Sequence, residues 1–183
     1  MKRRKKETTM NNHYVKSILY AYPNLEYVAE QIDKIVEEKA LLSMEDYKPC
    51  LEQCETIIEL TYQKDCLFAL KIIMDSVLKK LNKQESDYLE YKYFKRKPVS
   101  YFENFDAGSR TYFRKQATLA CKVGVLLERE GMTDEQFENK YLEIDFFKRL
   151  LKCTIEHEHA SYKNKSKKVK TFAQKMKVKK LSA

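Results

Sequence analysis

Glycine and proline are scarce in this chain, which carries only three of each among 183 residues. These two residues supply the backbone conformations that tight turns and hairpins need, so a fold with many strands and turns is disfavoured. Long helices joined by short connections remain. With 43 % apolar and 34 % charged residues, the chain can bury a hydrophobic core. We therefore expect an all-α protein of one or two small domains.

Apolar residues recur at helical spacing along residues 12–82. This spacing predicts a short helix that begins at Asn11 or Asn12, and a second helix that begins at Pro23. Pro49 is expected to open a third helix, and a fourth follows from Cys66 to Leu81. The apolar face of the third is predicted to consist of Leu51, Cys54, Ile57, Ile58 and Thr61. Four such helices predict an N-terminal helical bundle.

Positive charge is concentrated at the two ends of the chain. The net charge is +9, with five basic residues in positions 1–6 and nine lysines in positions 161–183, and no acid in either segment. The rest of the chain holds 22 basic and 27 acidic residues and is therefore acidic. We expect residues 1–11 and 161–183 to be disordered basic arms that bind polyanions with little specificity.

Several classes of function are disfavoured by what the sequence lacks. No long apolar run or signal sequence occurs, which favours a cytoplasmic protein with no membrane partner. Three of the five cysteines, Cys50, Cys54 and Cys66, could in principle share a zinc ion, but no histidine lies near them. They are read instead as free thiols that pack as small core residues. With no phosphate-binding loop or nucleophile motif either, we expect no metal, no cofactor and no enzymatic activity.

Residues 83–130 have a different pattern, which predicts a helix-turn-helix. A tyrosine-rich helix, Gln84 to Lys95, is interrupted by Lys97-Pro98. A short aromatic segment, residues 101–105, then leads to the link Asp106-Ala107-Gly108, and a glycine in so short a link indicates a turn between two helices. Ser109 is a natural N-cap for the second of them, which we expect to end near Arg129 with Gly131 after its C-terminus.

The helix that begins at Ser109 divides into two faces at about 100° per residue. The apolar arc contains Tyr112, Phe113, Gln116, Ala117, Leu119, Ala120, Val123, Leu126 and Leu127. The opposite arc contains Arg110, Thr111, Arg114, Thr118, Cys121 and Lys122. A recognition helix needs this division, because one face packs on the protein while the other offers arginine to guanine edges and short polar chains to phosphates. An ordinary solvated helix face is the alternative.

The surrounding charge and a family resemblance both favour DNA binding. Residues 92–122 carry eight basic and two acidic residues within an otherwise acidic chain. The segment 81–119, and above all Ser109-Arg110-Thr111-Tyr112-Phe113-Arg114, resembles region four of bacterial sigma factors and the ArpU-type phage regulators. The resemblance implies a helix-turn-helix that reads double-stranded DNA. The residues expected to contact DNA are Ser109, Arg110, Thr111, Arg114, Lys115, Thr118 and Lys122.

The last part of the chain predicts one more helix, residues 131–160. Thr133 to Gln136 has the pattern of a capping box, and an aromatic apolar face follows. Seven aromatic residues between positions 88 and 105 could stack on single-stranded bases, although their helical spacing favours packing in the core. These residues are Tyr88, Tyr91, Tyr93, Phe94, Tyr101, Phe102 and Phe105.

The pattern as a whole predicts a sequence-specific, sigma-like transcriptional regulator of phage or mobile-element type. Its expected partner is double-stranded DNA, with RNA polymerase and a second copy of the chain as further candidates. Two other functions stay open: a protein-interaction module such as an anti-sigma or accessory factor, and nonspecific RNA or ribosome binding through the basic arms. Residues 12–82 are expected to fold as a separate module, the alternative being one core shared with residues 83–130.

Overall fold

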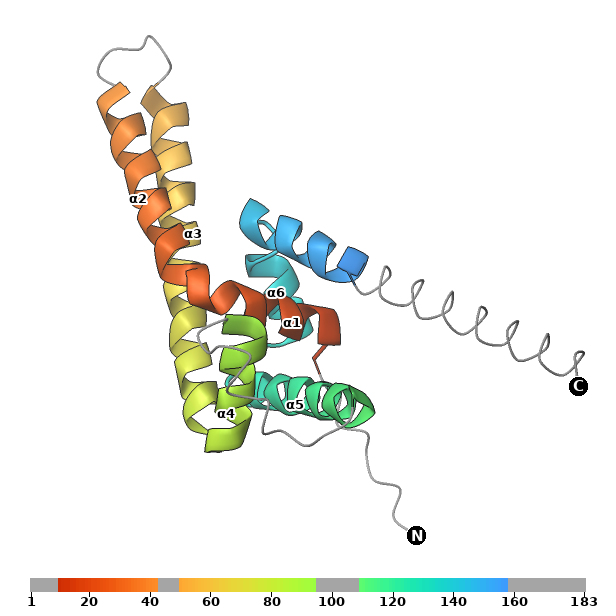
Figure 1. Ribbon diagram of the computed structural model, residues 1–183. Helices are drawn as coiled ribbons and strands as arrows, with labels where there is room; N and C mark the ends of the chain where they lie inside the picture. Colours follow the sequence, from red (N-terminus) through yellow and green to blue (C-terminus); the bar gives the residue numbers. More distant parts are fainter. Residues whose placement is uncertain (1–9, 43–49, 95–108, 158–183) are drawn as a thin grey trace, which may run out of the picture.

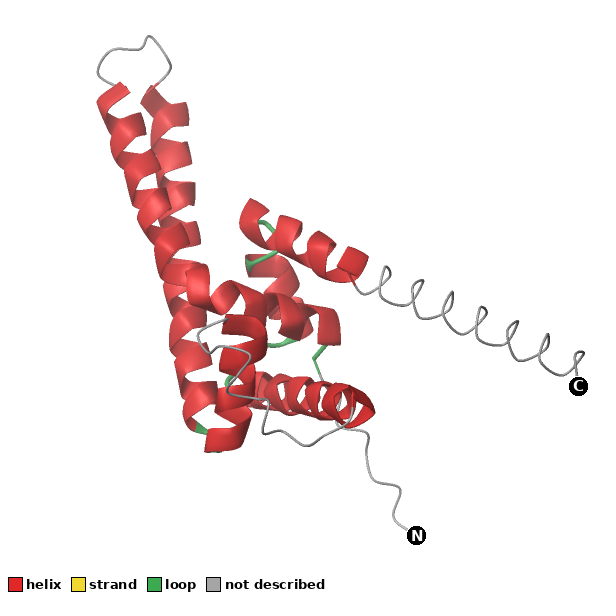
Figure 2. Cartoon of the chain, in the orientation of Figure 1, coloured by secondary structure: helices red, strands yellow, loops and turns green. Residues whose placement is uncertain are grey.

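The computed structural model describes residues 10–42, 50–94 and 109–157, and every regular element within these ranges is helical (Figures 1 and 2). The expectation of an all-α fold is therefore confirmed for the described residues. The predicted basic arms lie almost wholly outside these ranges. The elements in chain order are α1 (Asn12–Ala21), the short 3-10 helix η1 (Tyr22–Asn24), α2 (Leu25–Leu42), α3 (Cys50–Lys79), α4 (Lys83–Leu89), the π-helix η2 (Glu90–Phe94), α5 (Ser109–Arg129) and α6 (Asp134–Lys140), followed by a helical segment at residues 145–157.

The first two helices form where the sequence predicts them. The side chain of Asn11 accepts a hydrogen bond from the backbone N–H of His13 at 3.0 Å, which caps α1. Pro23 lies in the first turn of η1, where its missing N–H costs no intrahelical hydrogen bond. Tyr22 and Leu25 keep right-handed helical dihedral angles. The chain therefore bends between α1 and α2 without leaving the helical conformation (Figure 1).

The third and fourth helices expected from the sequence are one helix, α3, of 30 residues. That part of the prediction is wrong, because neither glycine nor proline separates Thr61 from Cys66, and Asp65 lies within the helix without capping it. The hydroxyl of Thr61 donates to the carbonyl of Ile57 within the same helix at 2.8 Å and so provides no break. The two halves of α3 differ in burial: none of residues 51–65 is buried, whereas Cys66, Leu67, Leu70, Met74 and Val77 are.

Helices α2 and α3 lie side by side as an antiparallel hairpin whose far end projects beyond the other helices (Figure 1). Two ion pairs join them: Lys64 Nζ lies 2.6 Å from an oxygen of Asp33, and Lys71 pairs with Glu26. The near half of α2 buries Leu25, Ala29 and Ile32. The predicted apolar face of the projecting half of α3 is largely exposed. Leu51 and Ile58 keep 70 % and 67 % of their surface accessible.

The core lies where α1 and the near half of α3 meet α5 and the C-terminal helices. Helix α1 crosses α5 closely at Gly124, where a Cβ atom would lie 3.2 Å from Val15 Cγ2. One continuous buried cluster contains Ile18 of α1, Leu70 of α3, Leu127 of α5 and Phe137 of α6. This shared cluster favours a single core for residues 12–82 and 83–130 over a separate N-terminal module.

The predicted terminal helix is two helical segments, because the chain turns at residues 141–144. The side chain of Thr133 caps α6 by accepting from the N–H of Gln136 at 3.2 Å, as the sequence predicts. The turn brings Phe137 and Phe147 edge to face, with ring centroids 5.7 Å apart. Helix α6 is tied to α1 by Tyr14, whose hydroxyl donates to Glu138 at 2.6 Å. This hydrogen bond, with burial, raises the pKa of Tyr14 to about 12.

Candidate nucleic-acid interface

Helix α5 has the length and the C-terminal end that the sequence predicts. It runs from Ser109 to Arg129, so Ser109 is its first helical residue and not the preceding cap. Gly131 has a φ of 88°, which only glycine adopts without strain. The N–H of Met132 then donates to the carbonyl of Leu127 at 2.9 Å and closes the helix end. The expected first helix and turn of the helix-turn-helix, residues 95–108, lie outside the described residues.

The two predicted faces of α5 are present in its described side chains. Apart from Gly124, the buried residues of α5 all belong to the predicted apolar arc: Leu119, Ala120, Val123, Leu126 and Leu127. The residues of the polar arc are exposed: Arg114, Thr118, Cys121 and Lys122. Ala117 was placed on the apolar arc but is also exposed. Of the expected DNA contacts, Ser109, Arg110 and Thr111 belong to α5, but their side chains lie outside the description.

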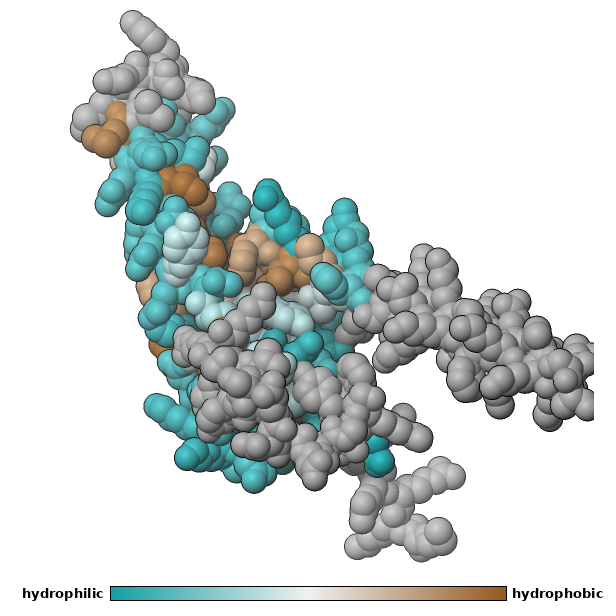
Figure 3. Space-filling model, in the orientation of Figure 1, coloured by the Kyte–Doolittle hydropathy of each residue, from teal (hydrophilic) through white to brown (hydrophobic). Residues whose placement is uncertain are grey.

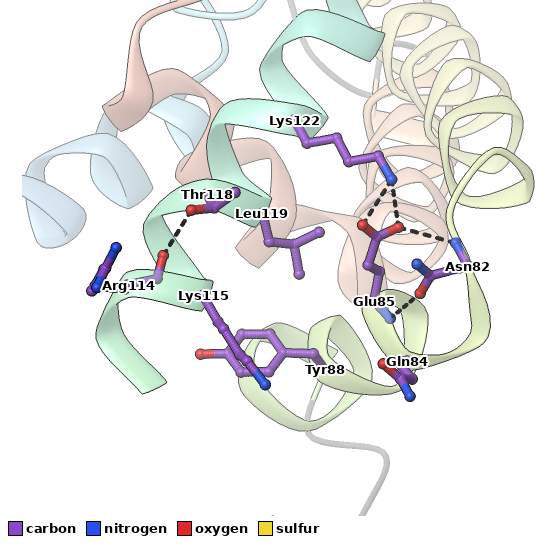
Figure 4. Close-up of a pocket in the computed structure, with 9 residues that line it drawn as sticks. All are labelled: Asn82, Gln84, Glu85, Tyr88, Arg114, Lys115, Thr118, Leu119 and Lys122. Carbon is purple, nitrogen blue, oxygen red and sulfur yellow. Dashed lines mark hydrogen bonds and ion pairs between the residues drawn. The ribbon is translucent and has the colours of Figure 1, made fainter. Parts of the chain in front are cut away.

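A cavity of about 440 Å³ lies between α4 and the exposed side of α5 (Figure 4). Both helices and the turn before α4 contribute to its wall. The residues that line it are Asn82, Gln84, Glu85, Tyr88, Arg114, Lys115, Thr118, Leu119 and Lys122. Four of the seven expected DNA contacts therefore surround one recess. The contribution from α4 was not predicted, because helical projection treats each helix alone.

Lys122 is held at one end of this cavity by Glu85 of α4. Its ammonium group donates to both carboxylate oxygens, at 2.7 and 2.6 Å. Glu85 also accepts from the N–H of Asn82, whose own side chain accepts from the N–H of Glu85, which completes a capping box. Burial opposes ionisation of Glu85. The hydrogen bonds from Lys122 and Asn82 outweigh burial and hold the pKa of Glu85 below its ordinary value.

The ion pair gives Lys122 a partner that the sequence does not predict. Lys122 stays a predicted DNA contact, and in this structure its ammonium group joins α5 to Glu85 of α4. The sequence contains a signal for Glu85 itself, because Asn82 and Glu85 have the spacing of a capping box. That pattern identifies Glu85 as a helix-capping residue. It does not indicate which distant lysine donates hydrogen bonds to the same carboxylate.

Arg114 lies at the opposite end of the cavity from the Glu85–Lys122 pair (Figure 4). Its side chain is exposed, as is that of Lys115 one residue later. The hydroxyl of Thr118 donates to the carbonyl of Arg114 at 3.0 Å, so it remains an acceptor for an outside donor. This end of the cavity therefore offers cationic donors on an exposed helical surface, the kind of group that receives phosphate or a guanine edge.

Aromatic residues of α4 and η2 lie in the core beside α5. Tyr88, Tyr93 and Phe94 are buried, which confirms core packing for these three. Tyr93 accepts a hydrogen bond from the side chain of Gln116 at 3.4 Å. Tyr101, Phe102 and Phe105 lie outside the described residues. The ring of Tyr93 also packs edge to face on Tyr20 of α1, and that of Phe94 packs on Tyr22, so the rings of η2 lie mainly against the end of α1.

The cysteines do not form a metal centre in the part of the chain that is described. Cys66 is buried, as a small core residue would be, whereas Cys54, Cys121 and Cys153 are exposed. The expectation that the thiols pack in the core is therefore wrong for Cys54. Within residues 10–42, 50–94 and 109–157, no three His, Cys, Asp or Glu side chains are placed to hold a metal ion.

No protein-family model, curated protein or solved structure matches the chain. The resemblance to sigma region four therefore rests on the residues of segment 81–119 alone. None of the described helices combines the length and the apolar character that crossing a bilayer requires.

Proposed function

We propose that this chain is a sequence-specific DNA-binding transcriptional regulator, sigma-like and of phage type, that acts without catalysis. The N-terminal half of α5 is the recognition helix of this proposal. The observation that carries it is the division of α5 into a buried apolar face and an exposed face with Arg114, Lys115 and Thr118. A helix presented in this way can enter the major groove without disturbing the core behind it.

Each exposed side chain has a distinct role in the proposed contact. Arg114 would place its planar guanidinium against the N7 and O6 atoms of guanine, a bidentate contact that discriminates between bases. Lys115 and Thr118 would bind phosphates, which sets the position of the helix but carries no sequence information. The Glu85–Lys122 pair would set the angle of α5 to α4, so Lys122 contributes to positioning and not to base reading.

The basic arms would add affinity for any duplex. Residues 1–6 and 161–183 carry fourteen basic residues and no acid. Each phosphate that they neutralise releases condensed counterions, and the binding constant then falls steeply as salt rises. Discrimination between sequences would remain with α5.

Replacement of Arg114 by alanine in the full-length chain tests the recognition helix. A preferred duplex is first selected from a random library with the parent protein. We expect Arg114→Ala to weaken binding to that duplex by about 1 to 3 kcal/mol, because a bidentate base contact is lost. The melting temperature should stay unchanged, because the side chain is exposed. Fluorescence anisotropy titrations and thermal denaturation give the two quantities.

Arg149→Ala is the matched control, since it removes an equally exposed arginine from residues 145–157. It should weaken binding to all duplexes alike and only slightly. If both variants bind the selected duplex equally well, Arg114 reads no base and the assignment of α5 is wrong. If no duplex is enriched during selection, the protein has no sequence preference, and the proposal fails as a whole.

Deletion of residues 161–183 distinguishes the proposal from nonspecific binding through the arms. We expect the shortened protein to keep its preference for the selected duplex while its affinity for every duplex falls. The slope of log K against log salt should become shallower, because fewer phosphates are neutralised. If deletion of residues 161–183 removed all sequence preference, the result would contradict the proposal and favour the arms as the binding element.

A further inference from the structure

Helix α3 exposes a row of large apolar side chains that starts in its projecting half and continues to Ile72 in the near half. Leu51, Ile58, Tyr62 and Ile72 keep 70 %, 67 %, 52 % and 70 % of their surface accessible. At about 100° per residue these four positions fall within an arc of roughly 80° on one side of the helix. Figure 3 shows hydrophobic side chains along this projecting part. We call these four residues the α3 stripe. A row of this kind marks a surface that another segment covers.

The surface around the α3 stripe is acidic. Helix α2 and residues 50–65 of α3 together carry nine acidic residues and three lysines. Glu55, Glu59 and Asp65 are exposed on the same helix as the stripe. One of the three lysines, Lys64, is already paired with Asp33. A segment that covers the stripe must therefore tolerate or neutralise a strong negative field.

We propose that the basic tail, residues 161–183 of the same chain, docks on the α3 stripe. This segment has the complementary chemistry, with nine lysines and no acid. It also carries Val169, Phe172, Ala173 and Met176 at the spacing i, i+3, i+4 and i+7. If the segment binds as a helix, this spacing places its apolar residues on one face toward the stripe. The lysines then lie beside the carboxylates of the hairpin.

The charge of the hairpin argues against a second copy of the hairpin as the occupant. Two such hairpins would bring two acidic surfaces together, and like charges at an interface oppose association. The tail has enough length to reach the stripe. Residues 158–168, which precede the apolar spacing, number 11, so they can extend over about 36 Å. The 18 residues of α2 span only about 27 Å. The docking needs no DNA, but it uses the lysines that the proposed function assigns to phosphates, so the hairpin and a duplex compete for this segment.

Site-specific photocrosslinking in the full-length chain tests this docking. The photoreactive residue p-benzoylphenylalanine replaces Ile58, and irradiation is followed by cleavage after glutamate. No acidic residue follows Glu158, so residues 159–183 are released as one fragment that mass spectrometry identifies. We expect this fragment to be the main adduct of position 58. Raising the salt concentration should reduce its yield, because opposite charges hold the tail in place.

Two comparisons make the result specific. The same photoreactive residue at Lys140, an exposed position of α6, is closer to the tail in sequence. It should nevertheless give several-fold less adduct with the tail, because position 140 lies outside the proposed docking surface. Charge reversal by Glu55→Lys with Glu59→Lys should lower the adduct at position 58 several-fold. Circular dichroism verifies that the folded structure is retained, which we expect because both side chains are exposed.

A mixture of nitrogen-15-labelled and unlabelled chains shows whether the tail comes from the same molecule. Adducts within one isotopic species support docking within the chain. Adducts between the two species, whether with the tail or with the α2–α3 hairpin, would overturn it and make a second copy the occupant. Equal capture at positions 58 and 140, or an adduct that charge reversal does not change, would also overturn the proposal.

Discussion

The body around α5 and the projecting half of the α2–α3 hairpin use the same kinds of apolar residue in opposite ways. In the body, Leu127, Phe137 and Phe147 are completely buried, because several helices meet there. In the hairpin, Leu51 and Ile58 keep about two thirds of their surface accessible, because only two helices are present to cover them. The body therefore carries the stability of the fold, while the hairpin keeps an apolar surface for contact.

Isolation of the N-terminal helices gives the largest expected effect. A fragment of residues 10–82 contains the whole hairpin but only α1 and part of α3 from the body. Ile18 and Leu70 would lose the partners that α5 and α6 provide in the shared cluster. We expect this fragment to show no cooperative thermal transition by circular dichroism, in contrast to the full chain. A cooperative transition would mean that residues 12–82 are the separate module that the sequence predicts.

Alanine substitutions at matched apolar positions compare the two regions directly. Phe137 is fully buried and packs against the rings of Tyr14, Tyr141 and Phe147. We expect Phe137→Ala to lower the free energy of unfolding by about 3 to 5 kcal/mol, through lost burial and the cavity that remains. Ile58→Ala in the hairpin should cost far less, about 1 kcal/mol or less, because only the docked residues 161–183 cover this side chain. Urea denaturation followed by circular dichroism measures both values.

The outcome for Ile58→Ala also bears on the tail. If this variant lost as much stability as Phe137→Ala, the hairpin would have to be covered in solution by something that contributes to folding. Equal losses would therefore remove the contrast between a stabilising body and an accessible hairpin.

The sequence predicts α5 better than α3 for a physical reason. Apolar and basic residues are segregated on α5, and the body supplies a partner for its apolar face, so projection of the sequence identifies its buried side. The distal part of α3 has an equally regular apolar row, but whether a partner exists depends on helices far away in the chain. Periodicity shows which residues can be buried together. It does not show whether another part of the fold reaches them.

The candidate site shows the same limit for charged residues. The exposed position of Arg114 follows from the helical pattern alone. The ion pair of Lys122 with Glu85 depends on how α4 packs beside α5. The two residues lie 37 positions apart in the sequence. A pair at this separation leaves no local pattern, so Lys122 was assigned the same role as the other cations of α5.

The Glu85–Lys122 pair gives the smallest expected effect and tests whether charge, besides apolar burial, holds α5 in the body. The pKa of Glu85 is lowered in the folded protein, so ionised Glu85 stabilises the fold. This contribution is complete above the ordinary glutamate pKa of about 4.3. It is lost as the pH falls through the lower pKa of the folded state. Both side chains are partly exposed, 43 % for Lys122 and 24 % for Glu85, so we expect about 1 kcal/mol or less.

Glu85→Gln should therefore unfold more easily than the parent protein near pH 7, and the difference should shrink as the pH falls below about 4. Urea denaturation at a series of pH values measures this difference. Glu55→Gln removes an exposed carboxylate from the hairpin and should stay within about 0.5 kcal/mol of the parent throughout. If Glu85→Gln behaves in the same way, the ion pair adds nothing to stability. The contact between α4 and α5 would then rest on apolar burial alone, and Lys122 would be available for DNA after all.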